Sequence, residues 1–288
     1  MVTMMNTIDE MIRLAFDEDC PNGDISAIDA FPKTHCSTAR IIAKESGIFY
    51  GKELSQTMVD YIEKLELNLN LDDGDAFQTG DILMTIEGAT LALLRLERVL
   101  LNFLQRLCGV SSITNHYVNA LNNPNIHILD TRKTTPLFRS LEKAAVVAGG
   151  GYNHRFSLSD MVLLKENHIN AICQSGGMAG LRRFLQTTRQ TQKCPIEIEI
   201  ETLDQLRTFP LDLVDIIMFD NMSLEDTKEG IAICKSRGLS AEIELSGNID
   251  LETISQYSEL DIQRISIGRL THSVKAIDLS LLLDDLIS

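Results

Sequence analysis

The feature that most constrains the fold is a repeated alternation of short apolar runs and helical segments after Asn125. Six apolar runs, each followed by polar residues, cover 126–129, 161–164, 196–201, 214–219, 241–245 and 264–267. Segments with helical periodicity lie between them, at 138–148, 177–190, 202–208, 223–237 and 250–257. Such alternation is typical of right-handed βαβ units and a parallel sheet. Six units are too few for a full barrel of about 250 residues, so we expect an incomplete or smaller parallel α/β barrel.

Residues 1–122 have a different pattern, which predicts a small open sheet in an α+β domain. Helical periodicity covers 7–19, 52–64, 90–107 and 110–121, and strand-like segments lie at 37–44, 47–51, 65–71 and 82–88. The turns Asp73-Gly74-Asp75 and Gly80-Asp81 resemble those of biotinyl or lipoyl carrier domains. Such a carrier needs a lysine at a hairpin tip, and none stands there, so we interpret the turns as structural.

The sequence Asn122-Asn123-Pro124-Asn125 is the clearest domain boundary. We therefore expect a first domain over 1–122 and a barrel domain over 123–269. The apolar stretch from Leu270 to Ile287 predicts a final helix, and we expect residues 270–288 to pack back on the first domain.

Composition and charge exclude several classes of protein. The net charge of −15 disfavours nonspecific binding to nucleic acid or anionic lipid. No apolar run approaches the roughly 20 residues of a membrane helix. The acidic, amphipathic N-terminus does not have the pattern of a signal peptide. The six scattered cysteines form no CxxC pair, which argues against a zinc site or disulfide framework and for a cytoplasmic location.

Charged and polar residues stand at the expected carboxyl ends of the barrel strands, which converge on one face of such folds and bind ligands there. The segment Asp130–His168 has six Lys and Arg against four Asp and Glu, whereas the chain has 26 against 41. A cationic pocket in an acidic protein indicates a small, highly anionic ligand. The alternative, a solvated basic loop, is less favoured because these cations follow strands and stand beside Gly and Thr. The residues collected in this way are Thr131, Arg132, Lys133, Lys165, Glu199, Asp220, Ser246, Gly247 and Gly268, with His154 and Arg155 from the loop after a triple glycine.

These residue types indicate particular ligands. Arginine presents a planar fork that matches a carboxylate or phosphate in two hydrogen bonds. Glu199 and Asp220, at successive strand ends, are carboxylates of the kind that hold Mg²⁺ together with substrate phosphates. Ser246-Gly247 and Gly268 follow the last two strands, where barrels commonly bind phosphate through backbone N–H groups. The set predicts a site for a polycarboxylate and a phosphorylated, metal-bound partner.

Nine motifs, in this order and spacing, resemble those of the quinolinate phosphoribosyltransferase family over essentially the whole chain. They are EDCPNGDIS, ERVLLNFLQRLCG, LDTRKTTP, GGGYNHR, LLKENHI, EIEIE, FDN, ELSGN and IGRLTHS. The resemblance implies an N-terminal open α/β sandwich, a C-terminal incomplete α/β barrel and a homodimer or larger assembly. It also implies an enzyme of NAD biosynthesis, a pentosyltransferase that converts quinolinate and phosphoribosyl pyrophosphate into nicotinate mononucleotide, pyrophosphate and CO₂.

The resemblance also assigns roles to individual residues. It implies that Arg132, His154, Arg155 and Lys165 bind quinolinate, and that Arg98 reaches in from the neighbouring subunit. It places Lys133 near the phosphates, Glu199 and Asp220 at the ribose and Mg²⁺, and Ser246, Gly247 and Gly268 at the 5′-phosphate. Lys133, Lys165, Glu199 and Asp220 would be the catalytic residues.

Several neighbouring residues are left open. His272 is a candidate for the site or for a helix cap, whereas His35, His116 and His127 match no motif and are expected at the surface or in the core. Glu197 and Glu201 flank Glu199, and either they point away from it or Glu201 joins the site. Leu137 stands where the family usually has glycine, in Thr-Thr-Pro-Gly-Leu-Arg, which changes the expected path of that loop.

Two rival functions are compatible with the same scaffold. One is a molybdenum-associated pyrophosphorylase-like homologue, which typically lacks the pattern found here at Lys165–His168. The other is a non-catalytic anion-binding or regulatory protein, which is disfavoured because every candidate substrate and metal residue is present. Quinolinate and phosphoribosyl pyrophosphate titrations with CO₂ detection separate the three.

Overall fold

The computed structural model describes residues 2–27, 29–62 and 64–285, with side chains from residue 8 to residue 284 apart from those two gaps. The chain divides into two compact units. Unit 1 comprises Met1–Asn115, Ser140–Gly150 and Val274–Ser288, and unit 2 comprises His116–Arg139 and Gly151–Ser273. The division differs in detail from the expected domains 1–122 and 123–269, because residues 116–122 go with unit 2 and residues 140–150 go with unit 1.

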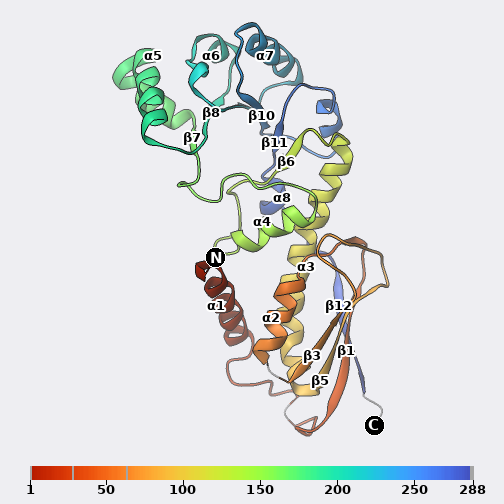
Figure 1. Ribbon diagram of the computed structural model, residues 1–288. Coiled ribbons are helices and arrows are strands. Elements are labelled where there is room, and N and C mark those ends of the chain that lie inside the picture. Colours follow the sequence, from red (N-terminus) through yellow and green to blue (C-terminus); the bar gives the residue numbers. More distant parts are fainter. Residues whose placement is uncertain (1, 28, 63, 286–288) are drawn as a thin grey trace. The chain divides into compact units, whose positions relative to one another are not determined.

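Unit 1 is built on an antiparallel four-stranded sheet in the order β12-β1-β5-β3 (Figure 1). A small second sheet pairs β2 with β4. The strands are β1 (Cys36–Ala43), β2 (Gly47–Ile48), β3 (Leu65–Leu69), β4 (Ala76–Phe77), β5 (Ile82–Ala89) and β12 (Leu279–Asp285). The helices are α1 (Val2–Asp19), α2 (Lys52–Ile62), α3 (Thr90–Leu121), which continues into unit 2, and α4 (Arg139–Ala148).

Alternation of side chains explains how this sheet forms. In β1 every second residue is buried, which is the pattern of a strand with one face on a core. Helix α4 is held to α3 by an ion pair in which Arg106 Nη2 lies 2.7 Å from Glu142 Oε1, and the Glu142 side chain is fully buried. This pair joins α4 to α3 within unit 1.

Unit 2 contains a six-stranded parallel sheet, which confirms the fold class expected from the six apolar runs. Its strands are β6 (His127–Leu129), β7 (Val162–Leu164), β8 (Ile196–Ile200), β9 (Ile216–Asp220), β10 (Glu242–Ser246) and β11 (Arg264–Ser266). The connections contain α5 (Glu166–Thr191), α6 (Leu203–Thr208), η1 (Leu211–Leu213), α7 (Leu224–Ser236) and η2 (Ile254–Tyr257), and α8 (Arg269–His272) follows β11. All five residues of β8 are buried, as in parallel sheets covered on both faces.

The order of the strands explains why the barrel is incomplete. The sheet runs β6-β11-β10-β9-β8-β7, so the first strand pairs with the last, while β6 and β7 stand at opposite edges. Between these two edges the chain leaves the sheet: residues 140–150 belong to unit 1, and Tyr152 then forms a parallel bridge with Leu129 of β6. His154 and Arg155 follow Tyr152 closely, in the loop that leads to β7.

Two expected elements differ from the structure. The helix predicted from Leu270 to Ile287 is wrong: α8 is short, and β12 pairs antiparallel with β1, with Leu281 opposite Ile41. The prediction of two separate helices at 90–107 and 110–121 is also wrong, because α3 runs without a break through Gly109. A side chain at Gly109 would meet the backbone of Lys275 and the side chain of Val274, so this glycine allows a close approach. In the part of the chain that the structure describes, no helix is long and apolar enough to cross a membrane.

Candidate active site

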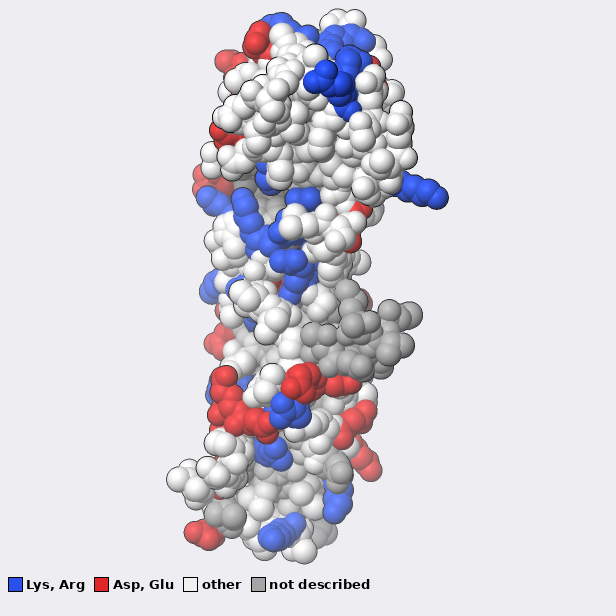
Figure 2. All heavy atoms as spheres, turned by 90° about the vertical axis from the view of Figure 1, so that its left-hand side faces the viewer, with Lys and Arg blue, Asp and Glu red and all other residues white. Residues whose placement is uncertain are grey.

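A cavity of about 670 Å³ opens at the carboxyl ends of the parallel strands in unit 2. Five Lys and Arg residues line it, against two carboxylates. Figure 2 shows Lys and Arg side chains gathered around a recess on one face of the molecule. The cavity brings together every residue selected from the sequence except Arg98, namely Thr131, Arg132, Lys133, His154, Arg155, Lys165, Glu199, Asp220, Ser246, Gly247 and Gly268.

Two threonine hydroxyls, one in the segment after β6 and one on α8, hold the backbone of Lys133. Thr131 Oγ1 accepts a hydrogen bond from the Lys133 backbone N–H at 3.0 Å, and Thr271 Oγ1 donates to the Lys133 carbonyl at 2.8 Å. A side chain at Gly268 would stand 3.1 Å from Lys133 Cδ and 3.0 Å from the His272 ring. Glycine therefore leaves room for a lysine and a histidine to lie against the backbone at this end of β11.

The loop that carries His154 and Arg155 depends on Asp130. This fully buried carboxylate accepts hydrogen bonds from the His154 backbone N–H at 2.9 Å and from Asn153 Nδ2 at 2.6 Å. Arg155 Nη1 donates to the Met161 carbonyl at 3.1 Å. Burial and the nearby charge of Arg132 lower the pKa of the Arg155 guanidinium, so two cations are held close together where an anion would relieve their repulsion.

Lys165 and Glu199 stand at the ends of β7 and β8. Lys165 Nζ donates to Glu199 Oε1 at 3.0 Å. Lys165 is the residue before α5, and the two strands pair in parallel with Leu164 opposite Ile198. The register of two short strands therefore sets this ion pair.

The opposite wall is made by tight backbone turns after β9 and β10. Asp220 lies opposite Ser246 in the ladder and accepts from Asn221 Nδ2 at 2.7 Å. Asn221, Gly247 and Asn248 all have positive φ, and Asn248 Nδ2 donates to Asn221 Oδ1 at 3.1 Å. A side chain at Gly247 would collide with the Asn221 amide, so both the conformation and the space call for glycine.

Leu137, which replaces the usual glycine of the motif, adopts φ +65° and is 80% exposed. The loop therefore keeps a left-handed conformation that favours glycine. Arg139 secures the neighbouring chain by donating to Thr134 Oγ1 at 3.0 Å and to the Phe156 carbonyl at 2.9 Å. The departure from the family motif thus concerns strain at one residue, and the loop stays anchored.

Arg98 belongs to unit 1, on α3, whereas the residues that line the cavity belong to unit 2. Its side chain is 56% exposed, and its Nη2 lies 3.8 Å from Glu97 Oε1. Such an exposed, weakly paired arginine is available to another molecule.

Both halves of the chain match the same family of enzymes. Residues 24–108 match the quinolinate phosphoribosyl transferase N-terminal domain, and residues 110–282 match its C-terminal domain. The chain belongs to the quinolinate phosphoribosyl transferase family. This agrees with the resemblance that the nine sequence motifs indicate.

Curated relatives and solved structures of the family are similar over nearly their whole lengths. A probable nicotinate-nucleotide pyrophosphorylase (carboxylating) of Bacillus subtilis is 38% identical over 92% of this chain and 90% of its own. A mitochondrial quinolinate phosphoribosyltransferase (decarboxylating) of Nicotiana tabacum is 34% identical over 96% and 82%. The crystal structure of NadC from Streptococcus pyogenes superposes with a TM-score of 0.88 at 39% identity, covering 97% of this chain and 98% of that one.

The cavity also contains residues that sequence reasoning missed. Asn221, Asn248 and Arg269 line it. Asp130 does not line it but accepts a hydrogen bond from the backbone N–H of His154, which does. The signal for Asp130 was present, because an aspartate directly after an apolar strand needs hydrogen-bond partners when it is buried. Glu197, whose place the sequence left open, and Glu244, which it did not single out, are completely buried on β8 and β10.

The residues left open by the sequence take different places. Glu201 is exposed and does not line the cavity, whereas His272 does, with its Nδ1 2.6 Å from Ser273 Oγ. His35 Nδ1 lies 2.7 Å from Thr90 Oγ1, and His127 stacks on Tyr152 with ring centroids 4.0 Å apart.

Proposed function

We propose that this protein transfers the phosphoribosyl group of phosphoribosyl pyrophosphate to quinolinate and removes one carboxylate, giving nicotinate mononucleotide, pyrophosphate and CO₂. The observation that carries the proposal is the cavity at the strand ends, where five cations and two carboxylates face a space of about 670 Å³ in a chain of this family. The excess of cations suits two polyanionic substrates. The two carboxylates suit a reaction that develops positive charge on a sugar.

Quinolinate would bind among Arg132, His154, Arg155 and Lys165. Burial and the nearby charge of Arg132 lower the pKa of Arg155, which supports this assignment, since a dicarboxylate between the two guanidinium groups would neutralise both. Two arginine forks and a lysine also fix the plane of the aromatic ring. Their contribution to catalysis is then orientation of the ring nitrogen toward the ribose.

Phosphoribosyl pyrophosphate would occupy the other end of the cavity. Ser246, Gly247 and Gly268 would bind the 5′-phosphate through backbone N–H groups and the serine hydroxyl, and Lys133 would contact the phosphates. The lack of a side chain at Gly247 and Gly268 supports this. A Cβ at Gly247 would meet the Asn221 amide, and a Cβ at Gly268 would meet the side chains of Lys133 and His272. Thr131 would hold the turn that presents Lys133.

Glu199 and Asp220 would hold Mg²⁺. Both offer hard carboxylate oxygens on the cavity wall, the donor type that Mg²⁺ prefers together with substrate phosphates. Slight desolvation of the exposed Glu201 carboxyl group, with the charges of Glu166, Glu199 and Asp220, raises the pKa of Glu201, so negative potential is concentrated at this end of β8. A bound Mg²⁺ would neutralise the charge that develops on the pyrophosphate leaving group.

The residues of the chain then act mainly by electrostatics and positioning. As the bond from ribose C1 to pyrophosphate breaks, positive charge develops on the sugar ring, and Glu199 and Asp220 stabilise it. The quinolinate nitrogen supplies the electron pair of the new bond, which makes a cationic pyridinium. When CO₂ leaves, the electron pair of the broken bond between ring carbon 2 and the carboxylate carbon stays on ring carbon 2. This carbon then takes up a proton. The reaction needs no nucleophile from the protein.

The assembly and location belong to the same proposal. A homodimer in which Arg98 enters the partner's cavity would give quinolinate a further cation, and the exposure of Arg98 supports this. All six cysteines are free thiols, which agrees with a cytoplasmic protein.

The decisive experiment mixes the purified protein with quinolinate, phosphoribosyl pyrophosphate and Mg²⁺ and measures CO₂ and nicotinate mononucleotide. We expect both products in equal amounts, and no turnover in excess chelator. Asp220→Asn should reduce kcat strongly. Binding of quinolinate without any CO₂ would identify a non-catalytic anion-binding protein instead, and turnover at full rate in chelator would contradict the metal site.

A further inference from the structure

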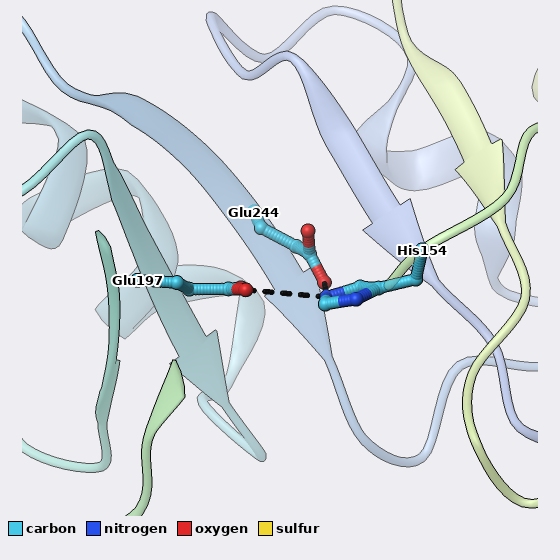
Figure 3. Close-up of side chains that lie close together, drawn as sticks. All are labelled: His154, Glu197 and Glu244. Carbon is cyan, nitrogen blue, oxygen red and sulfur yellow. Dashed lines mark ion pairs between the residues drawn. The ribbon is translucent and has the colours of Figure 1, made fainter. Parts of the chain in front are cut away.

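Three ionisable side chains meet inside the barrel, beneath the cavity. His154 Nε2 lies 3.2 Å from Glu197 Oε2 and 3.3 Å from Glu244 Oε1. Figure 3 shows the two carboxylates approaching the imidazole from β8 and from β10, with His154 carried by the chain that follows β6. Both glutamates are fully buried, and His154 is 8% exposed, at the floor of the cavity.

The two glutamates have no role in the site described above. Glu197 lies two residues before Glu199 on β8, so both point to the same face, with Glu197 one layer deeper. Glu244 lies two residues before Ser246 on β10 in the same way. Burying two carboxylates is costly, and apolar residues at such positions often stabilise a fold as well or better. A contribution to function would explain why the barrel interior contains them.

The opposite edge of the imidazole is fixed as well. His154 Nδ1 accepts a hydrogen bond from the Arg155 backbone N–H at 2.7 Å. The His154 backbone N–H is bound by Asp130. The ring is therefore held from two sides, by backbone groups of its own loop and by carboxylates from two strands that are separated in the sheet by β9.

This geometry places a proton on Nε2. A neutral ring that accepts at Nδ1 carries its proton at Nε2, and a charged ring carries protons at both nitrogens. Burial lowers the pKa of His154, whereas Glu197 and Glu244 raise it to about 9; the hydrogen bond accepted at Nδ1 opposes this rise, because a doubly protonated ring cannot accept there. In either charge state Nε2 presents an N–H to the carboxylates. It has no lone pair for a metal ion, although a histidine and two glutamates are a common ligand set.

We propose that Glu197 and Glu244 are positioning residues that lock the His154 imidazole, with its Nε2–H turned inward, as the floor of the quinolinate site. The inference rests on the proposed binding of quinolinate above His154. The carboxylates do not touch the substrate and act only through the ring. Their removal should therefore weaken quinolinate binding and leave phosphoribosyl pyrophosphate binding nearly unchanged.

Other charged groups near the cluster limit the choice of test. Arg264 on β11 acts on Glu197 and is itself paired with Glu242, with Nε 2.5 Å from Oε2. Arg155 adjoins His154 and lines the same cavity, as do Arg132 and Lys165. A second, smaller cavity is lined by His154, Arg155, Pro195 and Arg264, at the ends where β8 and β11 begin. None of these groups is changed in the variants below.

The kinetic test compares alanine and glutamine at each glutamate. Glu197→Ala and Glu244→Ala should each raise KM for quinolinate about tenfold and change KM for phosphoribosyl pyrophosphate less than about twofold, as expected for loss of one charged contact. Glu197→Gln and Glu244→Gln keep a side-chain oxygen beside Nε2–H and should stay within about threefold of wild type. Glu229→Ala, which removes an exposed carboxylate paired with Arg207 on the surface of unit 2, is the matched control. Equal effects on both KM values, or glutamine variants as weak as alanine variants, would overturn the proposal.

A second measurement does not depend on activity. In the ligand-free, ¹⁵N-histidine-labelled protein, the His154 ring should show a protonated Nε2 from pH 6 to pH 9, and its titration should shift to lower pH in Glu244→Ala. An unprotonated Nε2, or a stoichiometric metal ion lost in Glu244→Gln, would overturn the positioning role even if no variant could be assayed. If wild type shows this ring signature but binds no quinolinate, the proposed function fails and the cluster cannot position a substrate-binding group.

Discussion

Lys165 Nζ lies 3.0 Å from Glu199 Oε1, and this ion pair joins the ends of two adjacent parallel strands. The carboxylate is the more buried partner, with 10% of the Glu199 side chain exposed against 48% for Lys165. The desolvation penalty therefore falls mainly on Glu199, and the exposed ammonium is free to contact a ligand as well. The pair couples the proposed quinolinate end of the cavity to the proposed ribose end.

Glu199→Gln should reduce kcat by about 10²–10³-fold, because a neutral amide cannot stabilise the positive charge that develops on the ribose. Steady-state rates at saturating concentrations of both substrates measure the loss. Glu201→Gln is the matched control, since Glu201 follows the same strand but is exposed and lies outside the cavity lining. A Glu201→Gln enzyme that loses as much activity would instead assign the role to Glu201.

Asp130→Ala should lower the free energy of unfolding by about 3 kcal/mol, because it leaves the buried His154 N–H and the Asn153 amide without this acceptor. Chemical denaturation measures the change. Asp160 provides the comparison, because it accepts from the backbone N–H groups of Phe156 and Ser157 in the same loop but is exposed to water. Asp160→Ala should cost less than about 1 kcal/mol, and equal costs would contradict the argument from burial.

Gly247→Ala should raise KM for phosphoribosyl pyrophosphate by at least about tenfold, since a methyl group there must displace the Asn221 amide and disturb the turn that would hold the 5′-phosphate. Binding of quinolinate alone should change little. Gly238 also has positive φ, but a side chain there would meet no atom within 4 Å. Gly238→Ala therefore carries the conformational strain without the collision, and an equal rise in KM would show that strain alone is responsible.

The parallel sheet could be predicted because its strands are short, apolar and separated by helices, so each is recognisable locally. The residues that follow each strand could then be selected as candidates without knowledge of how the strands pair. β12 could not be predicted in this way. The segment Leu279-Ser280-Leu281-Leu282-Leu283 suits a helix as well as a strand, and only its partner β1, far away in sequence, decides between them.

The candidate site shows the same difference between local and long-range information. Residues that follow a strand were found from the sequence, whereas Glu197 and Glu244 were not assigned. A period-two pattern indicates which residues share a face, but it does not indicate whether that face meets solvent, a helix or the barrel interior. The partner of both glutamates, His154, comes from the loop that leads to β7, and no local pattern determines the path of that loop.

Leu137→Gly should stabilise the protein by roughly 0.5–1 kcal/mol. A left-handed conformation costs a non-glycine residue about 1–2 kcal/mol, and glycine loses about half of that gain through its greater freedom in the unfolded chain. No buried contact is lost, because Leu137 is 80% exposed. Leu158, 70% exposed and with negative φ, is the control: Leu158→Gly should be neutral or destabilising. Matching shifts in the two denaturation midpoints would exclude relief of strain at residue 137.

The last prediction concerns the proposed sharing of Arg98 between subunits. If Arg98 completes the partner's cavity, Arg98→Ala and Lys165→Ala should each be nearly inactive, because every site then lacks one cation. A heterodimer of the two variants has one site that lacks both residues and one in which both are intact, since a two-fold interface repeats the same contacts in both directions.

Mixing the two inactive enzymes should therefore restore activity. With free exchange of subunits, half of the dimers are mixed and about a quarter of all sites become functional. Mass spectrometry of the mixture measures the fraction of heterodimers directly. Arg155→Ala mixed with Lys165→Ala is the control, because Arg155 and Lys165 line the same cavity of one chain and no mixed dimer contains an intact Arg155–Lys165 site. If heterodimers form and the Arg98 mixture stays inactive, Arg98 acts within its own chain or not at all.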